Sequence, residues 1–76
     1  MNVILYTRQD CCLCEETEEV LRRARKLIRF DLERVYIDND TELRELYGDR
    51  VPVVTVDGRE IASTPVDEAS LLAALS

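Results

Sequence analysis

The sequence predicts one α/β domain over residues 1–76, with a mixed four-stranded sheet flanked by helices on both faces. The expected element order is β-α-β-(α)-β-β-α. Three observations support it: an apolar run, NVILYT, precedes a long segment of helical periodicity; a second β-rich run, FDLERVYID, follows; and VPVVTVDGREIA holds two short runs around an Asp-Gly pair that is typical of a hairpin.

The first strand is expected over Asn2–Thr7, because this run is almost continuously apolar and rich in β-formers. Such a run is typical of a strand inside a sheet and covered on both faces. The helix that follows is predicted from Cys11 to about Arg29. Its apolar positions recur at steps of three and four residues: Cys14, Thr17, Val20, Leu21, Ala24, Leu27 and Ile28. Acidic residues near its start and basic residues near its end suit the helix dipole and a solvated surface.

FDLERVYID is predicted to be a second strand, parallel to the first because a long helix connects the two. A short helix is then expected in NDTELRELYG. Asn39 and Glu42 stand at the spacing of a capping box, and Gly48 is the expected stop.

Two strands in VPVVTVDGREIA are expected to meet at Asp57-Gly58, a dipeptide that suits a type I′ turn. The last helix is predicted to start with Thr64 as N-cap, Pro65 in the first turn and Asp67 as the acidic N3 residue. Its apolar face is expected to consist of Leu71, Leu72 and Leu75.

The chain has ten basic and sixteen acidic residues, a net charge of -6, which argues against nucleic acid or an anionic membrane as a partner. MNVILYTRQD lacks a basic run followed by a long apolar stretch, and no segment is apolar enough to span a membrane. We therefore expect a cytoplasmic, monomeric protein. A domain this small has room only for a shallow site.

Cys11 and Cys14 are spaced so that their sulfurs fall on one face of the predicted helix and can form a disulfide. At the helix N-terminus, free amide N–H groups and the helix dipole lower the pKa of a thiol, and Arg8 would add to this effect. Glu15 and Glu16 oppose it. The sequence therefore predicts a moderately lowered pKa for Cys11. In a reducing compartment such cysteines indicate redox or metal chemistry rather than a permanent crosslink.

Cys12 is expected to be a small, partly exposed side chain, because a bridge to either neighbouring cysteine would be strained. Metal binding is the alternative use of the three cysteines. A closed zinc site needs four nitrogen or sulfur ligands, and the chain has three cysteines and no histidine, so we predict no metal site in a monomer. Cu(I), or a cluster shared between two chains, remains open.

The segments ILYTRQDCCLCEE, VYIDND and RVPVVTVDG and the last helix resemble, in order and spacing, the glutaredoxin branch of the thioredoxin-like proteins. The resemblance covers essentially the whole chain and is closest to the very small glutaredoxin-like domains. It implies a thioredoxin-like fold of the glutaredoxin type.

The resemblance also implies roles for individual residues. Cys11 would be the attacking thiol and Cys14 the resolving one. Arg8 stands where glutaredoxins have a basic residue near the glutathione carboxylate. Pro52 matches the cis-proline of the family, which turns the backbone of Val51 toward the sulfurs to pair with a bound peptide or glutathione. Without the resemblance, a trans proline opening an edge strand would be preferred.

The sequence departs from the family pattern before the last helix, where Ala62 and Ser63 replace the usual glycine pair that lets glutathione approach. Thr64 and Asp67 are the remaining candidates for polar contacts to the γ-glutamyl end. The implied partners are small thiols such as glutathione or protein disulfides, and the implied reductant is glutathione or a thioredoxin-type protein. No bound cofactor is expected.

The leading hypothesis is thus an enzyme, a small thiol-disulfide oxidoreductase that uses its Cys-x-x-Cys dithiol. A thiolate-based metal or iron-sulfur carrier is the alternative. Copper chaperones also place two cysteines after a first strand, but their order ends in a strand, whereas VDEASLLAAL has a helical pattern. A third hypothesis is an inactive thioredoxin-like module that docks through its acidic surface.

Overall fold

The computed structural model describes residues 1–75, and its elements follow the predicted order. The strands are β1 (Asn2–Thr7), β2 (Asp31–Tyr36), β3 (Val53–Val56) and β4 (Arg59–Ala62). The helices are α1 (Cys12–Ala24), α2 (Thr41–Tyr47) and α3 (Glu68–Leu75). The strands are ordered β2-β1-β3-β4, with β1 parallel to β2 and antiparallel to β3. The mixed four-stranded α/β fold predicted from the sequence is confirmed.

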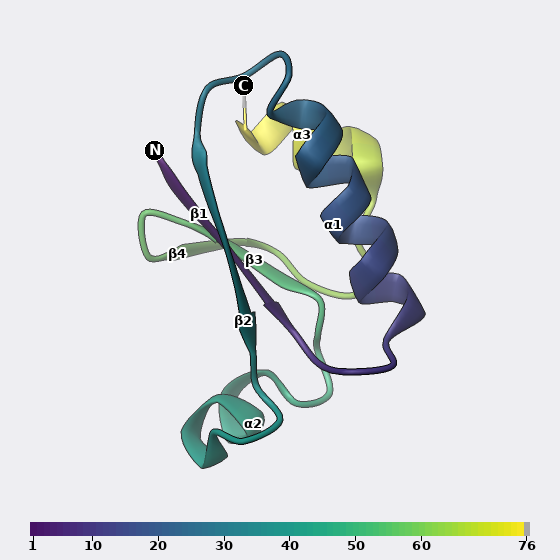
Figure 1. The fold of residues 1–76 in the computed structure, drawn as a ribbon, viewed down its shortest axis with the longest axis vertical. Helices are drawn as coiled ribbons and strands as arrows, with labels where there is room; N and C mark the ends of the chain where they lie inside the picture. Colours follow the sequence, from purple (N-terminus) through teal and green to yellow (C-terminus); the bar gives the residue numbers. More distant parts are fainter. Residues whose placement is uncertain (76) are drawn as a thin grey trace.

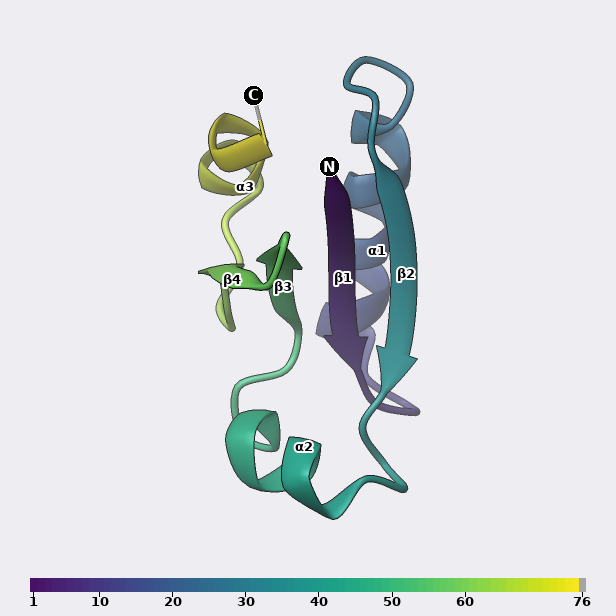
Figure 2. The ribbon, with the colours of Figure 1, turned by 90° about the vertical axis from the view of Figure 1, so that its left-hand side faces the viewer.

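The helices are not distributed as the sequence suggested. α1 and α3 lie together on one face of the sheet, whereas α2 lies beyond the end of the sheet (Figure 1). The face turned to the viewer in Figure 2 has no helix across β1 and β2. The first residues of β1 and the last residues of α3 lie at the end of the molecule away from the start of α1. Within residues 1–75, no helix has the length and apolarity that a membrane crossing needs.

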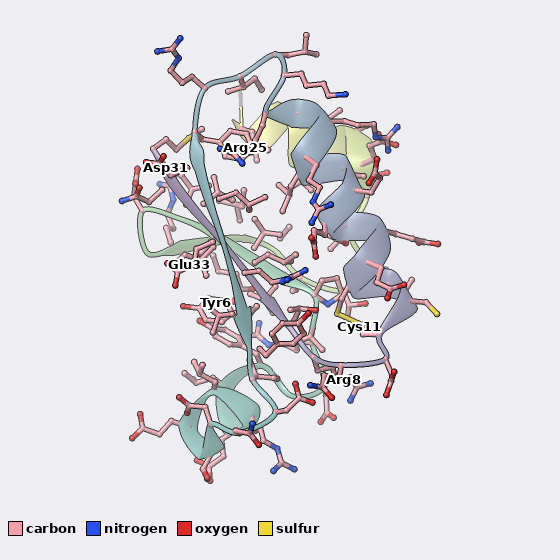
Figure 3. All side chains as sticks on the ribbon, in the orientation of Figure 1. Tyr6, Arg8, Cys11, Arg25, Asp31 and Glu33 are labelled. Atoms are coloured by element: carbon pink, nitrogen blue, oxygen red, sulfur yellow. A yellow bond between two sulfur atoms is a disulfide. The ribbon has the colours of Figure 1, made fainter. Side chains whose placement is uncertain are left out.

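β1 alternates between the two faces of the sheet. Val3, Leu5 and Thr7 are at most 4% exposed and point toward α1 and α3. Ile4 and Tyr6 are half-buried on the opposite face, and Figure 3 shows Tyr6 and Glu33 on the side of the sheet away from α1. β1 is therefore central, as predicted, but helices cover only one of its faces.

The larger of two apolar clusters fills the space between the sheet and the two long helices, and we call it the main core. Its buried members are Val3, Leu5, Leu21, Ala24, Phe30, Val54, Leu71 and Leu75. They come from β1, β3, α1 and α3 and from the segment before β2, so the main core joins both ends of the chain.

α1 ends at Ala24, earlier than the predicted Arg29. Leu27, which was expected on the buried stripe, is 89% exposed. The cause is Phe30, which is buried in the main core and whose carbonyl accepts a hydrogen bond from Arg25 Nε at 3.2 Å. Because the chain must bring Phe30 back to the start of β2, it leaves the helix before the local apolar pattern ends.

α2 is capped by Asp40 rather than by the predicted Asn39. The Asp40 carboxylate accepts a hydrogen bond from the Leu43 amide at 3.0 Å, which satisfies one free N–H of the first turn. Gly48 ends the helix as predicted. α2 has no fully buried residue, and this explains why it lies at the end of the sheet rather than across a face.

The hairpin forms as predicted. Asp57 and Gly58 have φ values of 50° and 88°, the positive pair that a type I′ turn requires. The Asp57 carboxylate also accepts a hydrogen bond from the Asn2 amide at 2.9 Å, which joins the turn to the start of β1.

α3 starts later than the predicted Thr64-Pro65, at Glu68. Asp67 is the capping residue, because its carboxylate accepts from the Ser70 amide at 3.1 Å and its carbonyl accepts from the Leu71 amide at 2.9 Å. Leu71 and Leu75 are buried as expected, and Leu72 packs half-buried against the main core.

Candidate active site

A short loop between β1 and α1 positions the cysteine motif. The Gln9 amide donates to the Asp38 carboxylate at 3.2 Å, so the loop is attached to the residues that follow β2. The Ile37 amide donates to the Thr7 carbonyl at 2.9 Å and holds the same two strand ends together. Asp10 adopts a positive φ of 58°, which turns the chain into the helix. The site is thus built where two parallel strands end.

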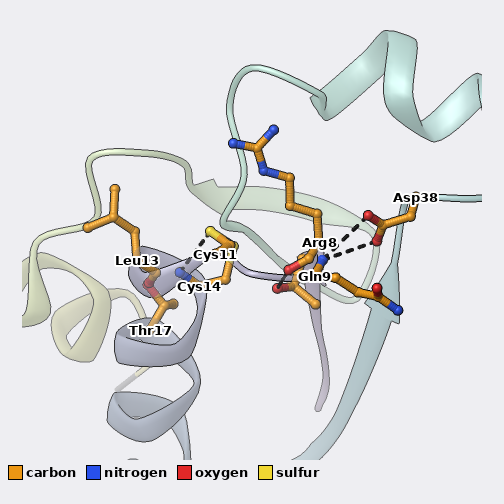
Figure 4. Close-up of a disulfide and its surroundings, with 8 residues drawn as sticks. Arg8, Gln9, Cys11, Leu13, Cys14, Thr17 and Asp38 are labelled. Atoms are coloured by element: carbon orange, nitrogen blue, oxygen red, sulfur yellow. Dashed lines mark hydrogen bonds between the residues drawn. A yellow bond between two sulfur atoms is a disulfide. The ribbon is translucent and has the colours of Figure 1, made fainter.

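Cys11 and Cys14 are joined by a disulfide at the start of α1 (Figure 4). Cys11 is the N-cap, with an extended backbone, and its sulfur accepts a hydrogen bond from the Cys14 amide at 3.2 Å. Their Cα atoms are 5.2 Å apart, within the usual range for a disulfide. Cys11 is half-buried, whereas Cys14 is 2% exposed. The more accessible sulfur is therefore the one at the tip of the helix.

Beneath the disulfide lies a second, smaller apolar group, which we call the dithiol cluster. Its buried members are Cys14, Ile37 and Val51, and Tyr6, Cys11, Leu43 and Tyr47 pack around them. The rings of Tyr6 and Tyr47 lie 4.7 Å apart between centroids. Burial, with smaller contributions from Tyr47 and Glu33, raises the pKa of Tyr6 above its ordinary value. The disulfide is thus supported on an apolar, partly aromatic base.

The Val51–Pro52 peptide bond is cis, and both residues are buried. Val51 belongs to the dithiol cluster together with Cys14. Its amide donates to the Tyr47 carbonyl at 3.0 Å. No described residue donates a hydrogen bond to its carbonyl oxygen. Of the two backbone groups of Val51, the carbonyl is the one free to pair with another chain.

Both polar candidates before α3 form hydrogen bonds within the protein, Thr64 through its backbone amide and Asp67 through its side chain. The Thr64 amide donates to the Arg50 carbonyl at 3.0 Å. The Asp67 carboxylate accepts from the amide and the hydroxyl of Ser70, the latter at 2.8 Å. A ligand that used Asp67 would compete with the capping of α3.

Arg8 is exposed and lines a cleft of about 690 Å³, which lies between the cysteine loop and α2. Arg44 lines the same cleft, and within residues 1–75 neither guanidinium forms an ion pair. Asp38, Glu45 and Asp49 also border it. The cleft therefore presents cations close to the cysteine loop, but among carboxylates.

The acidic residues after the motif differ in their surroundings. Glu18 forms ion pairs with Arg22 and with Arg34, whose NH1 lies 3.1 Å from a Glu18 oxygen. The hydrogen bond and the charge of Glu18 raise the pKa of Arg34. Glu15 and Glu16 are exposed, and no cation of residues 1–75 pairs with them. Their negative charge therefore remains uncompensated near the cysteines.

Cys12 is the first residue of α1 and is exposed as a free thiol, as predicted. Among the described residues, no three or more cysteine, aspartate or glutamate side chains converge on a point where a metal ion could bind. The metal-carrier alternative therefore finds no set of ligands within this part of a single chain.

Two residues of the site were not predicted from the sequence. Asp38 anchors the cysteine loop, and its signal was its place directly after a strand that runs parallel to β1. Leu13 is 54% exposed at the start of α1, and in Figure 4 the disulfide lies between Leu13 and Arg8. Its signal was that it falls outside the buried stripe formed by Cys14, Thr17 and Leu21.

Comparison with known proteins adds three similarities. The protein Rv0508 of Mycobacterium tuberculosis is 36% identical over 95% of this chain and 79% of its own length. The X-ray structure of the protein XcR50 from X. campestris superposes with a TM-score of 0.82 at 40% identity, over 96% of this chain and 93% of that one. The glutaredoxin-like protein NrdH-redoxin from Escherichia coli gives a TM-score of 0.62 at 28% identity, over 100% and 96%.

The model of the family described as "Glutaredoxin-like domain (DUF836)" matches residues 2–76, nearly the whole sequence. Its match agrees with the mixed sheet and with the Cys-x-x-Cys pair at the start of α1. The chain belongs to this family of small glutaredoxin-like domains in the thioredoxin-like superfamily.

Proposed function

We propose that the protein is a thiol-disulfide oxidoreductase that works through Cys11 and Cys14. The observation that carries the proposal is the placement of the two sulfurs: an accessible Cys11 at the N-cap of α1 is bonded to a buried Cys14 one turn later. A pair that bonds without rearrangement of the backbone can pass between dithiol and disulfide while the fold stays intact.

The reaction starts from the reduced dithiol. The Cys11 thiolate attacks one sulfur of a substrate disulfide, a mixed disulfide forms, and the other substrate sulfur leaves as a thiolate that takes up a proton. The Cys14 thiol then loses its proton and attacks the Cys11 sulfur, which releases the second substrate thiolate. The substrate gains two electrons and two protons, and the protein ends with the Cys11–Cys14 disulfide. Glutathione or a thioredoxin-type protein returns the electrons.

The surroundings of Cys11 support its role as the attacking group. An amide of the first helical turn already donates to its sulfur, and such donors favour the thiolate over the thiol. Burial keeps Cys14 from external disulfides, so it meets the mixed disulfide only from within the molecule. The free carbonyl of Val51 supports backbone pairing with a substrate, and Arg8 supports attraction of a substrate carboxylate.

Two classes of partner are consistent with the family: small thiols such as glutathione, and proteins that contain a disulfide. The glutaredoxin-like protein NrdH-redoxin from E. coli has a thioredoxin-like activity profile. This similarity supports a thioredoxin-like activity for this chain.

The test is the reduction of hydroxyethyl disulfide by the prereduced protein. The rate is measured as the loss of the protein's free thiols with time. Cys11→Ser is expected to lower the rate by more than about a hundredfold, because no other accessible thiol occupies the N-cap. Cys14→Ser is expected to accumulate the mixed disulfide on Cys11, seen as a mass increase. Cys12→Ser is the matched control and should react at the normal rate. Equal rates for Cys11→Ser and the unmodified protein would contradict the mechanism.

A further inference from the structure

A groove of about 360 Å³ lies between α1 and the segment that leads into α3. Its apolar lining consists of Leu13, Val20, Pro52 and Val66. Leu13 lies beside the disulfide in Figure 4 and is more than half exposed although it is apolar. Pro52 follows Val51, whose carbonyl is free. The groove therefore lies next to the cysteine motif, through Leu13, and has room for an apolar side chain or two.

The rim of this groove is acidic. Glu16 and Glu19 line it from α1, and neither pairs with a cation of residues 1–75. The other two charged residues of the lining, Arg23 and Glu68, form an ion pair at 3.3 Å and largely cancel each other. What remains is an apolar surface bordered by two uncompensated negative charges.

We propose that this groove selects the substrate: it binds a segment of a disulfide-containing protein in which an apolar residue and a basic residue stand next to the reacting cysteine. This inference rests on the proposed oxidoreductase function and adds the class of substrate to it. The apolar side chain covers Leu13 and Val66, and the basic side chain pairs with Glu16 or Glu19. The substrate backbone donates to the Val51 carbonyl.

The same charges act against oxidised glutathione, which carries more carboxylates than ammonium groups and is an anion at neutral pH. Two charges about 7 Å apart in water interact by roughly 0.6 kcal/mol, so two such pairs change a rate by about five- to tenfold. The effect is confined to low ionic strength, because salt of about 0.1 M screens charges over roughly 10 Å. The groove therefore predicts a preference for cationic over anionic substrates that salt weakens.

The experiment compares two synthetic peptides, each with one internal disulfide and a leucine beside one cysteine, that differ only in lysine or glutamate at the flanking positions. The second-order rate constant for oxidation of the prereduced protein is measured by stopped flow. Attraction of the lysines and repulsion of the glutamates multiply, so we expect the lysine peptide to react about 25- to 100-fold faster at low salt, and the two rates to converge at high salt. The double variant Glu16→Gln/Glu19→Gln should reduce the ratio to about twofold or less. Leu13→Ala should slow both peptides.

The matched control is Glu33→Gln/Glu42→Gln, which removes the same charge from exposed residues that do not line the groove. It should leave the ratio between the peptides unchanged. Equal rates for the two peptides, a faster glutamate peptide, or an equal effect of the control variant would overturn the inference while the oxidoreductase function stands. If neither peptide nor hydroxyethyl disulfide oxidises the protein, the proposed function itself is wrong.

Discussion

The main core and the dithiol cluster are two regions of one small domain with opposite characters. The main core has eight fully buried residues and is enclosed by the sheet, α1 and α3. The dithiol cluster has three, one of which is the disulfide-bonded Cys14, and is bordered by half-buried tyrosines and by α2, a helix with no buried residue.

The two regions contribute differently: the main core to stability, and the dithiol cluster to the surroundings of the sulfurs. Apolar burial provides most of the free energy of folding, so the main core carries most of the stability of the domain. The dithiol cluster needs only enough packing to hold two sulfurs at bonding distance and to keep one of them covered. Local opening is expected first where fewer apolar contacts hold the chain, which here is the dithiol cluster.

The largest expected effect comes from the main core. Leu5→Ala removes a side chain that is fully buried in β1 and should lower the free energy of unfolding by about 2–5 kcal/mol, as measured by urea denaturation. Leu27→Ala is the matched control, because Leu27 is 89% exposed and the same substitution there should change stability by less than about 0.5 kcal/mol. Similar losses at the two sites would refute the assignment of the main core.

A smaller effect on stability is expected in the dithiol cluster. Ile37→Val leaves a gap the size of a methyl group beside Cys14 and should cost about 0.5–1.5 kcal/mol. Alkylation of Cys14 in the reduced protein, followed by mass spectrometry, should become several-fold faster. Ile4→Val on the open face of the sheet serves as the control and should leave Cys14 protected. If the alkylation rate does not rise, the cluster is not what covers Cys14.

The smallest effect concerns the pH dependence of stability. Burial raises the pKa of Tyr6, so the unfolded chain loses this proton first, near pH 10, as the pH increases. The contribution of the protonated Tyr6 side chain to the free energy of unfolding is complete below pH 10. It is lost as the pH rises through the raised pKa of Tyr6 in the folded state. In the oxidised protein, the fall in the urea midpoint between pH 9 and pH 11 should be shallower for Tyr6→Phe than for the unmodified chain. An identical fall would show that Tyr6 does not titrate differently on folding.

Local signals predicted the two ends of α1 with unequal success. At the first end, the spacing of Cys11 and Cys14 was enough, because a helix start is decided by the residues that cap it. At the second end, the apolar pattern continued past Ala24 while the chain turned away. The position of this end depends on Phe30, which is buried against elements far away in the sequence. The residues next to α1 in the sequence give no sign of that burial.

The candidate site divides in the same way. The spacing of Cys11 and Cys14 predicted that they could form the disulfide seen here. Pro52 was singled out only through the resemblance to glutaredoxins, and Arg8 by its place three residues before Cys11. The sequence did not identify Asp38 or the groove at Leu13, because both depend on which strand ends and which helix faces meet in space. The sequence does not show which strand ends and helix faces lie next to one another until the order of the strands in the sheet is known.

β1 runs from the end of the molecule that carries the first residue toward the end that carries the disulfide, and α3 finishes near the start of β1 (Figure 1). A tether attached before β1 would therefore leave the sulfurs pointing outward. Under the proposed mechanism, the Cys14→Ser variant could be immobilised on a resin by such a tether. Partners held as mixed disulfides on Cys11 could then be eluted with a reductant while the variant itself stays on the solid support.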